Sequence, residues 1–128
     1  MIKEKELESV SKLEPQKRYE YFMKKITDAE KLWTLKNEEG DIALASIEDK
    51  ILISFWSDED YAKLCKINEW QNYKYYSFNI EELENYFFKL VEEKGYLINI
   101  FPVNDKSGFV VNLKEFKRDL YNELENYY

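Results

Sequence analysis

Apolar positions recur along the chain with two different periods, and the changes between them separate expected helices from expected strands. Residues 2–13, and the stretch that begins at Pro15, have apolar side chains three and four positions apart, which is typical of helices with one buried face. Proline suits the first turn of a helix, because its missing N–H would have no partner there. The core-facing stripe of the second helix is Tyr19, Phe22, Met23 and Ile26.

Short runs rich in β-branched, aliphatic and aromatic residues follow, and they predict strands over residues 32–36, 42–47 and 51–56. The connections at 37–41 and 48–50 are short, and Gly40 can supply a positive φ in the first of them. Strands joined this closely are expected to be antiparallel neighbours, because a parallel crossover needs far more chain. We therefore expect a three-stranded meander over residues 32–56.

The second half of the chain alternates helix start signals with short apolar runs. Three pairs of residues have the spacing of helix N-caps, namely Ser57 with Asp60, Asn79 with Glu82, and Asn112 with Glu115. The clearest helix covers residues 80–94 and ends at Gly95. Residues 66–78 show no clean periodicity and are expected to be irregular. Strands over 96–101 and 109–111 predict a C-terminal hairpin, which a last helix follows.

The order of these elements is α-α-β-β-β-α-α-β-β-α, and a run of strands followed by helices and a hairpin indicates an α+β fold. We expect a mostly antiparallel sheet of about five strands, made of the meander and the C-terminal hairpin and packed by amphipathic helices. A chain of 128 residues has the usual size of one domain. Residues 1–128 are therefore expected to form a single domain, with residues 1–14 as a charged helical extension.

Charge narrows the range of partners. Nineteen basic and 26 acidic residues give a net charge of −7. A nucleic-acid surface needs Lys and Arg to displace counterions from phosphates, so nucleic acid is not expected as a partner. A basic protein is a better match, since opposite charges speed encounter. The same charge also serves solubility alone.

The cysteine count and the hydropathy pattern favour a cytoplasmic setting. Cys65 is the single cysteine, so no disulfide can form within the chain, which fits a reducing compartment. The first residues are charged and do not resemble a signal peptide. No stretch approaches 18 uncharged apolar residues, so no membrane association is expected.

Residue types that carry common chemistry are scarce. The chain has no histidine, which removes the commonest general base near neutral pH and every His-based metal site. Cys65 lies on the apolar stripe of its helix with Tyr61 and Leu64, and is interpreted as a packing residue. Asp41, Glu48 and Lys50 have the spacing of metal-dependent nucleases, but turn chemistry explains them. We expect no catalytic residue, no cofactor and no metal.

An acidic run at Asp58, Glu59 and Asp60 is explained by the start of a helix, where the dipole favours negative charge. The aromatic residues leave two alternatives open, because 17% of the chain is Phe, Trp or Tyr. They can fill the core, or some of them can line a binding surface, where Tyr and Trp are favoured. The tentative binding surface consists of Trp56, Asp58, Tyr61, Trp70 and Tyr73.

Several stretches, taken in order, resemble an uncharacterised family of small bacterial proteins known as domain of unknown function 2750. The stretches are Arg18–Phe22, Leu32–Leu35, Phe55–Ala62, Glu69-Trp70, the helix Ile80–Lys94, Ile100–Pro102 and Gly108–Val111. The resemblance covers about residues 15–115. It implies a compact cytoplasmic bacterial domain and brings no reaction, cofactor or catalytic residue.

The sequence therefore favours a non-enzymatic, protein-binding module, in one version an immunity-type protein that blocks a basic toxin. The alternative is a small-molecule-binding protein or an unusual enzyme, with a pocket near Trp56, Asp58 and Trp70. The chain is expected to be a monomer or a weak homodimer formed through its amphipathic terminal helices.

Overall fold

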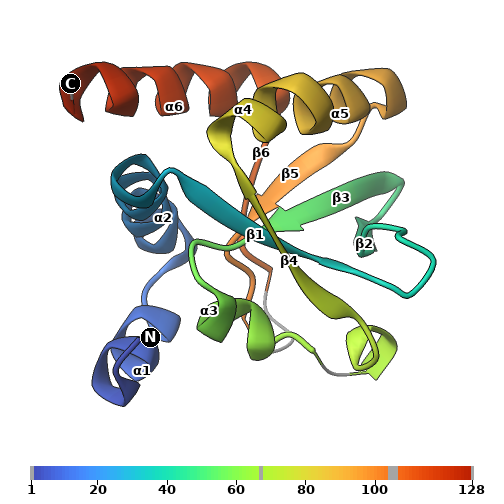
Figure 1. Cartoon of the computed structure of the whole chain (residues 1–128), viewed down its shortest axis with the longest axis horizontal. Helices are drawn as coiled ribbons and strands as arrows, with labels where there is room; N and C mark the ends of the chain where they lie inside the picture. Colours follow the sequence, from blue (N-terminus) through green and yellow to red (C-terminus); the bar gives the residue numbers. More distant parts are fainter. Residues whose placement is uncertain (1, 67, 104–106, 128) are drawn as a thin grey trace.

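A computed structural model describes residues 2–66, 68–103 and 107–127 and has the expected α+β architecture (Figure 1). Helices pack around six strands, which form two sheets in this part of the chain. In chain order the elements are α1 (Glu4–Ser11), α2 (Pro15–Ala29), β1 (Lys31–Lys36), β2 (Leu44–Ile47), β3 (Lys50–Phe55), α3 (Glu59–Lys63), η1 (Asn68–Trp70), β4 (Lys74–Asn79), α4 (Ile80–Glu82), η2 (Leu83–Phe87), α5 (Phe88–Lys94), β5 (Leu97–Ile100), β6 (Phe109–Val111) and α6 (Leu113–Tyr127).

The larger sheet has the strand order β2-β3-β5-β6. The β2–β3 hairpin and the C-terminal β5–β6 pair are antiparallel, as the sequence predicts. Part of the turn between the two strands of the predicted C-terminal hairpin, residues 104–106, lies outside the described residues. The central pair β3 and β5 is parallel, with Ile53 opposite Ile98 and Phe55 opposite Ile100. This pairing joins the two predicted hairpins into one sheet through a crossover that contains helices.

The predicted three-stranded meander is wrong in one respect, because β1 is not a strand of the larger sheet. It pairs instead with β4 in an antiparallel two-stranded sheet, with Leu32 opposite Phe78. Isolated bridges, Trp33 to Trp56 and Lys36 to Ile42, and a hydrogen bond from the Thr34 hydroxyl to the Ser54 carbonyl connect it to the neighbouring segments. The prediction that residues 66–78 are irregular is also wrong where β4 begins, at Lys74.

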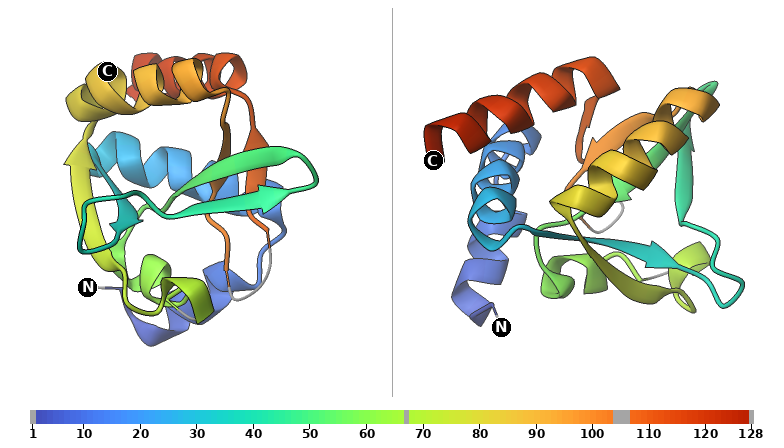
Figure 2. Two further views of the ribbon diagram at one scale, coloured as in Figure 1. Left: turned by 90° about the vertical axis from the view of Figure 1, so that its right-hand side faces the viewer. Right: turned by 45° about the horizontal axis from the view of Figure 1, so that its top comes forward.

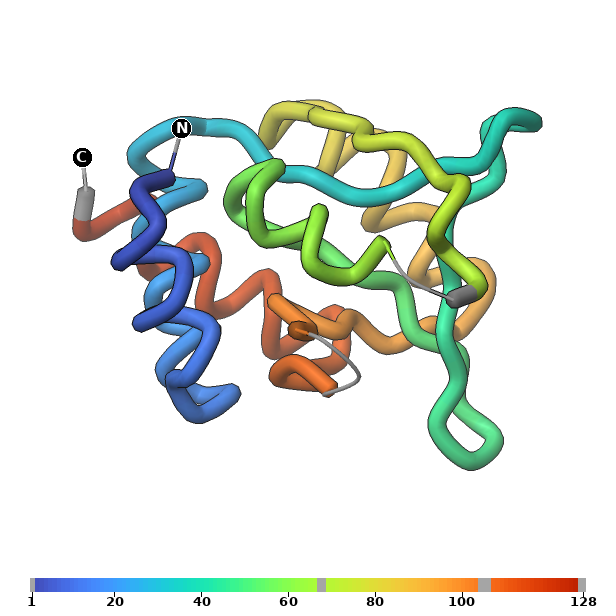
Figure 3. Tube along the Cα trace, turned by 90° about the horizontal axis from the view of Figure 1, so that it is seen from below, coloured from blue at the N-terminus to red at the C-terminus, as the bar shows by residue number. Residues whose placement is uncertain are grey.

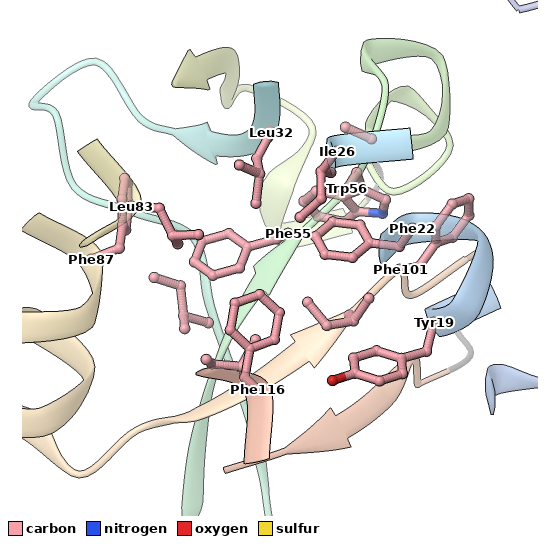
Figure 4. Close-up of a cluster of buried hydrophobic side chains, with 14 of the residues drawn as sticks. Tyr19, Phe22, Ile26, Leu32, Phe55, Trp56, Leu83, Phe87, Phe101 and Phe116 are labelled. Atoms are coloured by element: carbon pink, nitrogen blue, oxygen red, sulfur yellow. The ribbon is translucent and has the colours of Figure 1, made fainter. Parts of the chain in front are cut away.

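The core lies between the larger sheet and the helices α2, α5 and α6, which cover one side of it (Figures 1 and 2). Its largest fully buried rings include Phe22, Phe55, Phe87 and Phe116, which come from four different elements and converge in Figure 4. Phe55 is packed edge-on against Phe87 at a centroid distance of 5.5 Å. Aromatic pairs in this geometry stabilise a core beyond the area that they bury.

Side chains at the helix ends satisfy several backbone groups as predicted. Asn79 and Asn112 each accept a hydrogen bond from the backbone N–H three residues later, at 2.8 Å. Gly95 ends α5 in the left-handed conformation, with φ of 71°. The N-cap predicted at Ser57 is wrong, because the structure begins α3 one residue later. Asp58 occupies the cap position and accepts a hydrogen bond from the Ser57 hydroxyl.

The helix predicted over 80–94 contains one wide turn of π-helix at Leu83–Phe87. Such a turn inserts a residue and rotates the face that follows it. Leu83 and Phe87 before the shift, and Phe88 and Val91 after it, are all buried. The wide turn therefore keeps side chains on both sides of it turned toward the core.

The N-terminal helix α1 packs on the rest of the domain rather than projecting from it (Figure 1). The Ile2 backbone N–H donates to the Asp60 carboxylate at 2.8 Å, and Val10 is buried. The Tyr21 hydroxyl donates to the Glu6 carboxylate at 2.6 Å. No helix formed by the described residues combines the length and apolar character needed to cross a bilayer.

Candidate functional site

Two of the five residues in the tentative binding surface lie in the core. Trp56 and Tyr61 are fully buried, so neither ring contributes to an exposed surface. The Trp56 indole N–H donates to the Pro102 carbonyl at 2.9 Å, and the Tyr61 ring packs on Phe101 with centroids 4.5 Å apart. Large rings with one satisfied polar atom suit such positions, because they bury much apolar area without leaving a donor unpaired.

The other three residues are half-buried. Trp70 stands edge-on against Trp56, with ring centroids 6.3 Å apart, and Tyr73 packs at the margin of the core. Asp58 forms an ion pair with Lys25 at 3.8 Å. It also lines a shallow hollow of about 380 Å³, together with Ile2, Ala29, Lys31, Trp33, Ser57, Glu59 and Asp60. A hollow thus exists beside Asp58, but the lining contains neither Trp56 nor Trp70.

The tyrosines of β4 are half-buried and already have partners. The Lys36 ammonium lies 3.6 Å from the centroid of the Tyr76 ring, and the Lys66 ammonium lies 4.6 Å from that of Tyr75. The Tyr76 hydroxyl donates to the Glu82 carboxylate, which together with burial raises the pKa of Tyr76 to about 12. These phenols therefore remain neutral near pH 7, and their ring faces are occupied by cations from the same chain.

A buried arginine that sequence reasoning did not select organises the loop after β5. Arg18 donates from Nε to the Phe101 carbonyl at 3.0 Å, and its terminal nitrogens donate to the carbonyls of Leu13 and Ser107. Burial lowers the pKa of Arg18 from its usual value. The sequence does indicate that Arg18 is buried, because Arg18 precedes Phe22 by four residues and therefore lies on the same core-facing side of α2.

An exposed, strongly charged surface is formed by the β2–β3 hairpin with the loop before it, residues 37–50, which we call the acidic hairpin. Its tip projects away from the body of the domain (Figure 3 and the left view of Figure 2). The segment carries five carboxylates and one lysine, at Glu38, Glu39, Asp41, Glu48, Asp49 and Lys50, and all six side chains are exposed. Sequence reasoning noticed Asp41, Glu48 and Lys50 only as an accidental nuclease-like spacing.

Aliphatic side chains accompany these charges. Leu44, Ile47 and the adjoining Ile51 are 36%, 41% and 40% exposed, so three large aliphatic side chains face solvent around one hairpin. Leu44 and Ile51 lie on one face of the hairpin and Ile47 on the other, so each face carries an exposed aliphatic side chain beside the charged residues. In the described part of the chain, no three His, Cys, Asp or Glu side chains come together as a group able to hold a metal ion.

Comparison with known proteins places the chain in a family. A family model described as a protein of unknown function, DUF2750, matches residues 19–120. The chain belongs to the DUF2750 family. The resemblance predicted for about residues 15–115 is thereby confirmed. No curated protein matches the chain.

In this DUF2750 domain, the stretches that carry the family resemblance are largely packing residues. Phe101 contacts Arg18 and Tyr61, and Pro102 accepts the hydrogen bond from Trp56. A Cβ added to Gly108 would lie 2.1 Å from the Ile100 carbonyl oxygen, so the close approach of these two segments requires glycine. The matched region also contains the acidic hairpin, whose six charged side chains are exposed.

Proposed function

We propose that this DUF2750 domain is a non-enzymatic protein-binding module whose acidic hairpin binds a basic partner protein. The observation that supports the proposal is the composition of the acidic hairpin, in which five carboxylates and one lysine flank exposed Leu44 and Ile47. Aliphatic contacts supply affinity at the centre of an interface. Carboxylates around them speed association with a positively charged surface and select against acidic partners.

The proposal extends to biological setting. A bacterial, cytoplasmic protein of net charge −7 is suited to bind and neutralise a basic protein, as an immunity-type protein does with a toxin. Opposite net charges increase the rate of encounter, which matters when the partner must be intercepted before it acts. In this version the basic partner is the toxin, and the acidic hairpin covers the surface through which that toxin works.

Two features support a role without catalysis. The chain lacks histidine, so general-base chemistry near neutral pH would depend on groups with strongly shifted pKa values. Its single thiol is buried, and the Cys65 sulfur donates to the Pro102 carbonyl at 3.2 Å. A nucleophilic cysteine needs access to substrate and a positive environment that favours the thiolate.

Affinity capture with matched variants tests the proposal. Wild-type protein would be immobilised and incubated with an extract of its source cells at low and at moderate salt. We expect basic proteins to be retained by the wild type and released by moderate salt. The variant Glu38→Gln, Glu39→Gln, Asp49→Asn should lose them, whereas the control Glu92→Gln, Glu93→Gln, Glu125→Gln, with the same net charge, should retain them. Equal retention by both variants would contradict the proposal.

The hollow beside Asp58 supports a second candidate, the binding of a small molecule. Its volume of about 380 Å³ lies within the range of ligand sites, and the Lys31 ammonium sits 4.8 Å from the centroid of the half-buried Trp33 ring at its edge. Ligand-observed NMR with a fragment library would test it. Binding that the substitution Trp33→Leu abolishes would favour this role, and an absence of hits would exclude it.

A further inference from the structure

The free edge of the larger sheet runs along β2. Its sheet order begins β2-β3, and in the described part of the chain no strand pairs with the outer side of Leu44–Ile47. Residues of an antiparallel strand alternate between those bonded to the neighbour and those whose N–H and C=O point away. Two of these four residues therefore direct backbone donors and acceptors toward solvent, at the part of the hairpin that projects in Figure 3.

Apart from its shortness, this edge lacks the sequence features by which proteins usually prevent strand pairing. Natural edges carry lysine, proline or inward-pointing charges on the strand itself. The β2 sequence is Leu-Ala-Ser-Ile, which has no charge and no proline, and its burial pattern is mostly exposed. Leu44 shares a face with Ser46, and Ile47 shares the other face with Ala45, because side chains alternate along a strand. Each face of the edge thus offers one exposed aliphatic side chain.

The charges of the acidic hairpin lie at the two ends of this edge. Glu38, Glu39 and Asp41 precede β2, and Glu48 and Asp49 follow it. The four strand residues span roughly 13 Å at about 3.3 Å per residue. An extended segment laid along them would have its flanking residues beside carboxylates at both ends. A second copy of this chain would bring the same carboxylates against each other, and like charges oppose that pairing.

We propose that β2 accepts an added strand, and that the occupant is an extended segment of another protein that alternates aliphatic and basic residues. This inference rests on the proposed function and specifies its binding mode. Backbone hydrogen bonds to the β2 edge would supply register, aliphatic side chains would contact Leu44 and Ile47, and flanking lysines or arginines would meet the carboxylates. The partner then needs a flexible or exposed segment rather than a preformed surface.

A synthetic peptide of alternating valine and lysine, acetylated and amidated at its ends, is the probe. Binding to the full chain would be followed by fluorescence anisotropy, and amide hydrogen exchange would be read by NMR. We expect binding, with protection of two alternate amides within Leu44–Ile47. The Glu38→Gln, Glu39→Gln, Asp49→Asn variant should bind about tenfold more weakly, since three ion pairs are lost. The Glu92→Gln, Glu93→Gln, Glu125→Gln control should bind within about twofold of wild type.

A second peptide separates strand addition from simple charge attraction. The same sequence with N-methylated valines keeps its charge and side chains but cannot donate from alternate backbone nitrogens. Loss of its binding supports strand addition. Equal binding of both peptides overturns strand addition while leaving a basic partner for the acidic hairpin. No binding of either peptide also overturns it, and the capture experiment then decides the proposed function separately.

Sedimentation of the chain alone completes the test. We expect no self-association through β2 without peptide, because each copy carries a net charge of −7. A concentration-dependent dimer in which the Leu44–Ile47 amides are already protected would assign the edge to a second copy and overturn the proposal.

Discussion

The Nε atom of Arg18 donates a hydrogen bond of 3.0 Å to the carbonyl of Phe101, which lies 83 residues later in the chain. Phe101 has a φ of 61°, a left-handed conformation that costs a residue with a Cβ about 1–2 kcal/mol. The same guanidinium also donates to the carbonyls of Leu13 and Ser107. One buried side chain therefore joins the start of α2 to both sides of the loop between β5 and β6, and holds Phe101 in its strained conformation.

Replacing this arginine should destabilise the domain strongly. Arg18→Lys keeps the charge but loses the planar fork, so it cannot serve three carbonyls at once. We expect a loss of about 2–4 kcal/mol, because hydrogen bonds to charged groups are stronger than neutral ones and a buried carbonyl is left unpaired. Urea unfolding would measure it. Arg118→Lys is the control, since its exposed side chain pairs with the adjacent Asp119, and it should change stability by less than about 0.5 kcal/mol. Equal midpoints for the two variants would refute the role of Arg18.

Two glycines should respond differently to alanine. At Gly108 the added Cβ would lie 2.1 Å from the Ile100 carbonyl oxygen, so backbone must move. At Gly40 the site is open, and only its φ of 88° penalises a side chain. We expect Gly40→Ala to cost about 1–2 kcal/mol and Gly108→Ala to cost about 3 kcal/mol or more. Thermal unfolding would rank the two, and the reverse order would show that the β5–β6 approach is not tight.

Features of the fold that depend on residues close together in the chain could be predicted from the sequence. Caps at Asn79 and Asn112, and the helix end at Gly95, depend on contacts within a few residues, and all three are confirmed. The pairing of β1 with β4 was missed because the paired residues lie between 38 and 48 positions apart in the chain, as with Leu32 opposite Phe78. The Lys74–Asn79 strand was missed because tyrosine has both polar and apolar character, which hides the alternation of buried and exposed positions.

At the candidate site, too, local features could be predicted from the sequence and long-range contacts could not. Burial of Trp56 and Tyr61 depends on the loop at Phe101 and Pro102, which no local pattern links to them. The sequence analysis named Trp70 and Trp56 in the same surface, but neither spacing nor charge indicates that their rings are in contact. That contact is seen only in the folded chain. The acidic hairpin was predicted as two strands and a turn, but its exposure as a sheet edge depends on where β1 pairs.

Two helix ends offer a matched pair of substitutions. Glu30 at the end of α2 and Gly95 at the end of α5 share the left-handed conformation, with φ of 55° and 71°. Each donates its backbone N–H to the carbonyl four residues earlier. Glu30→Gly should stabilise the domain by about 0.5–1 kcal/mol and Gly95→Ala should destabilise it by a similar amount. Differential scanning calorimetry would detect both shifts. A destabilising Glu30→Gly would mean that the glutamate makes a contact worth more than the strain.

Alkaline pH should unfold the domain. Burial raises the pKa of Tyr61 to about 12, and burial with a hydrogen bond to Glu84 raises that of Tyr121 to about 12. An unfolded tyrosine has a pKa near 10. The unfolded chain therefore loses these protons first, so the stability that they contribute is complete below about pH 10 and is lost as pH rises toward 12. The absorbance of tyrosinate at Tyr61 and the circular dichroism of the fold should therefore change over the same pH range.

Tyr21→Phe tests the origin of that alkaline transition. The Tyr21 hydroxyl lies 3.0 Å from that of Tyr61 and donates to Glu6, and burial raises its pKa further still. Removing the Tyr21 hydroxyl should move the midpoint pH of alkaline unfolding upward, once the change in stability at pH 7 is taken into account. The reason is that one buried phenol no longer ionises on unfolding. Tyr86→Phe, at an exposed ring, is the control and should leave the midpoint unchanged. An unchanged midpoint in Tyr21→Phe would show that this cluster does not govern alkaline unfolding.

The thiol of Cys65 should report on the loop that Arg18 holds. The Cys65 sulfur donates to the Pro102 carbonyl, the residue after the one that Arg18 binds, and the thiol is buried. Alkylation by iodoacetamide therefore requires local or global opening, and its rate in the native protein should be low. Arg18→Lys should accelerate alkylation by roughly thirtyfold for each 2 kcal/mol of stability that it removes. The rate rises because it is proportional to the population of open molecules. Arg118→Lys should react at the wild-type rate, and all variants should react equally in denaturant. Fast alkylation of the folded wild type would mean that Cys65 is reached without opening, and that the loop at Pro102 is looser than its hydrogen bonds indicate.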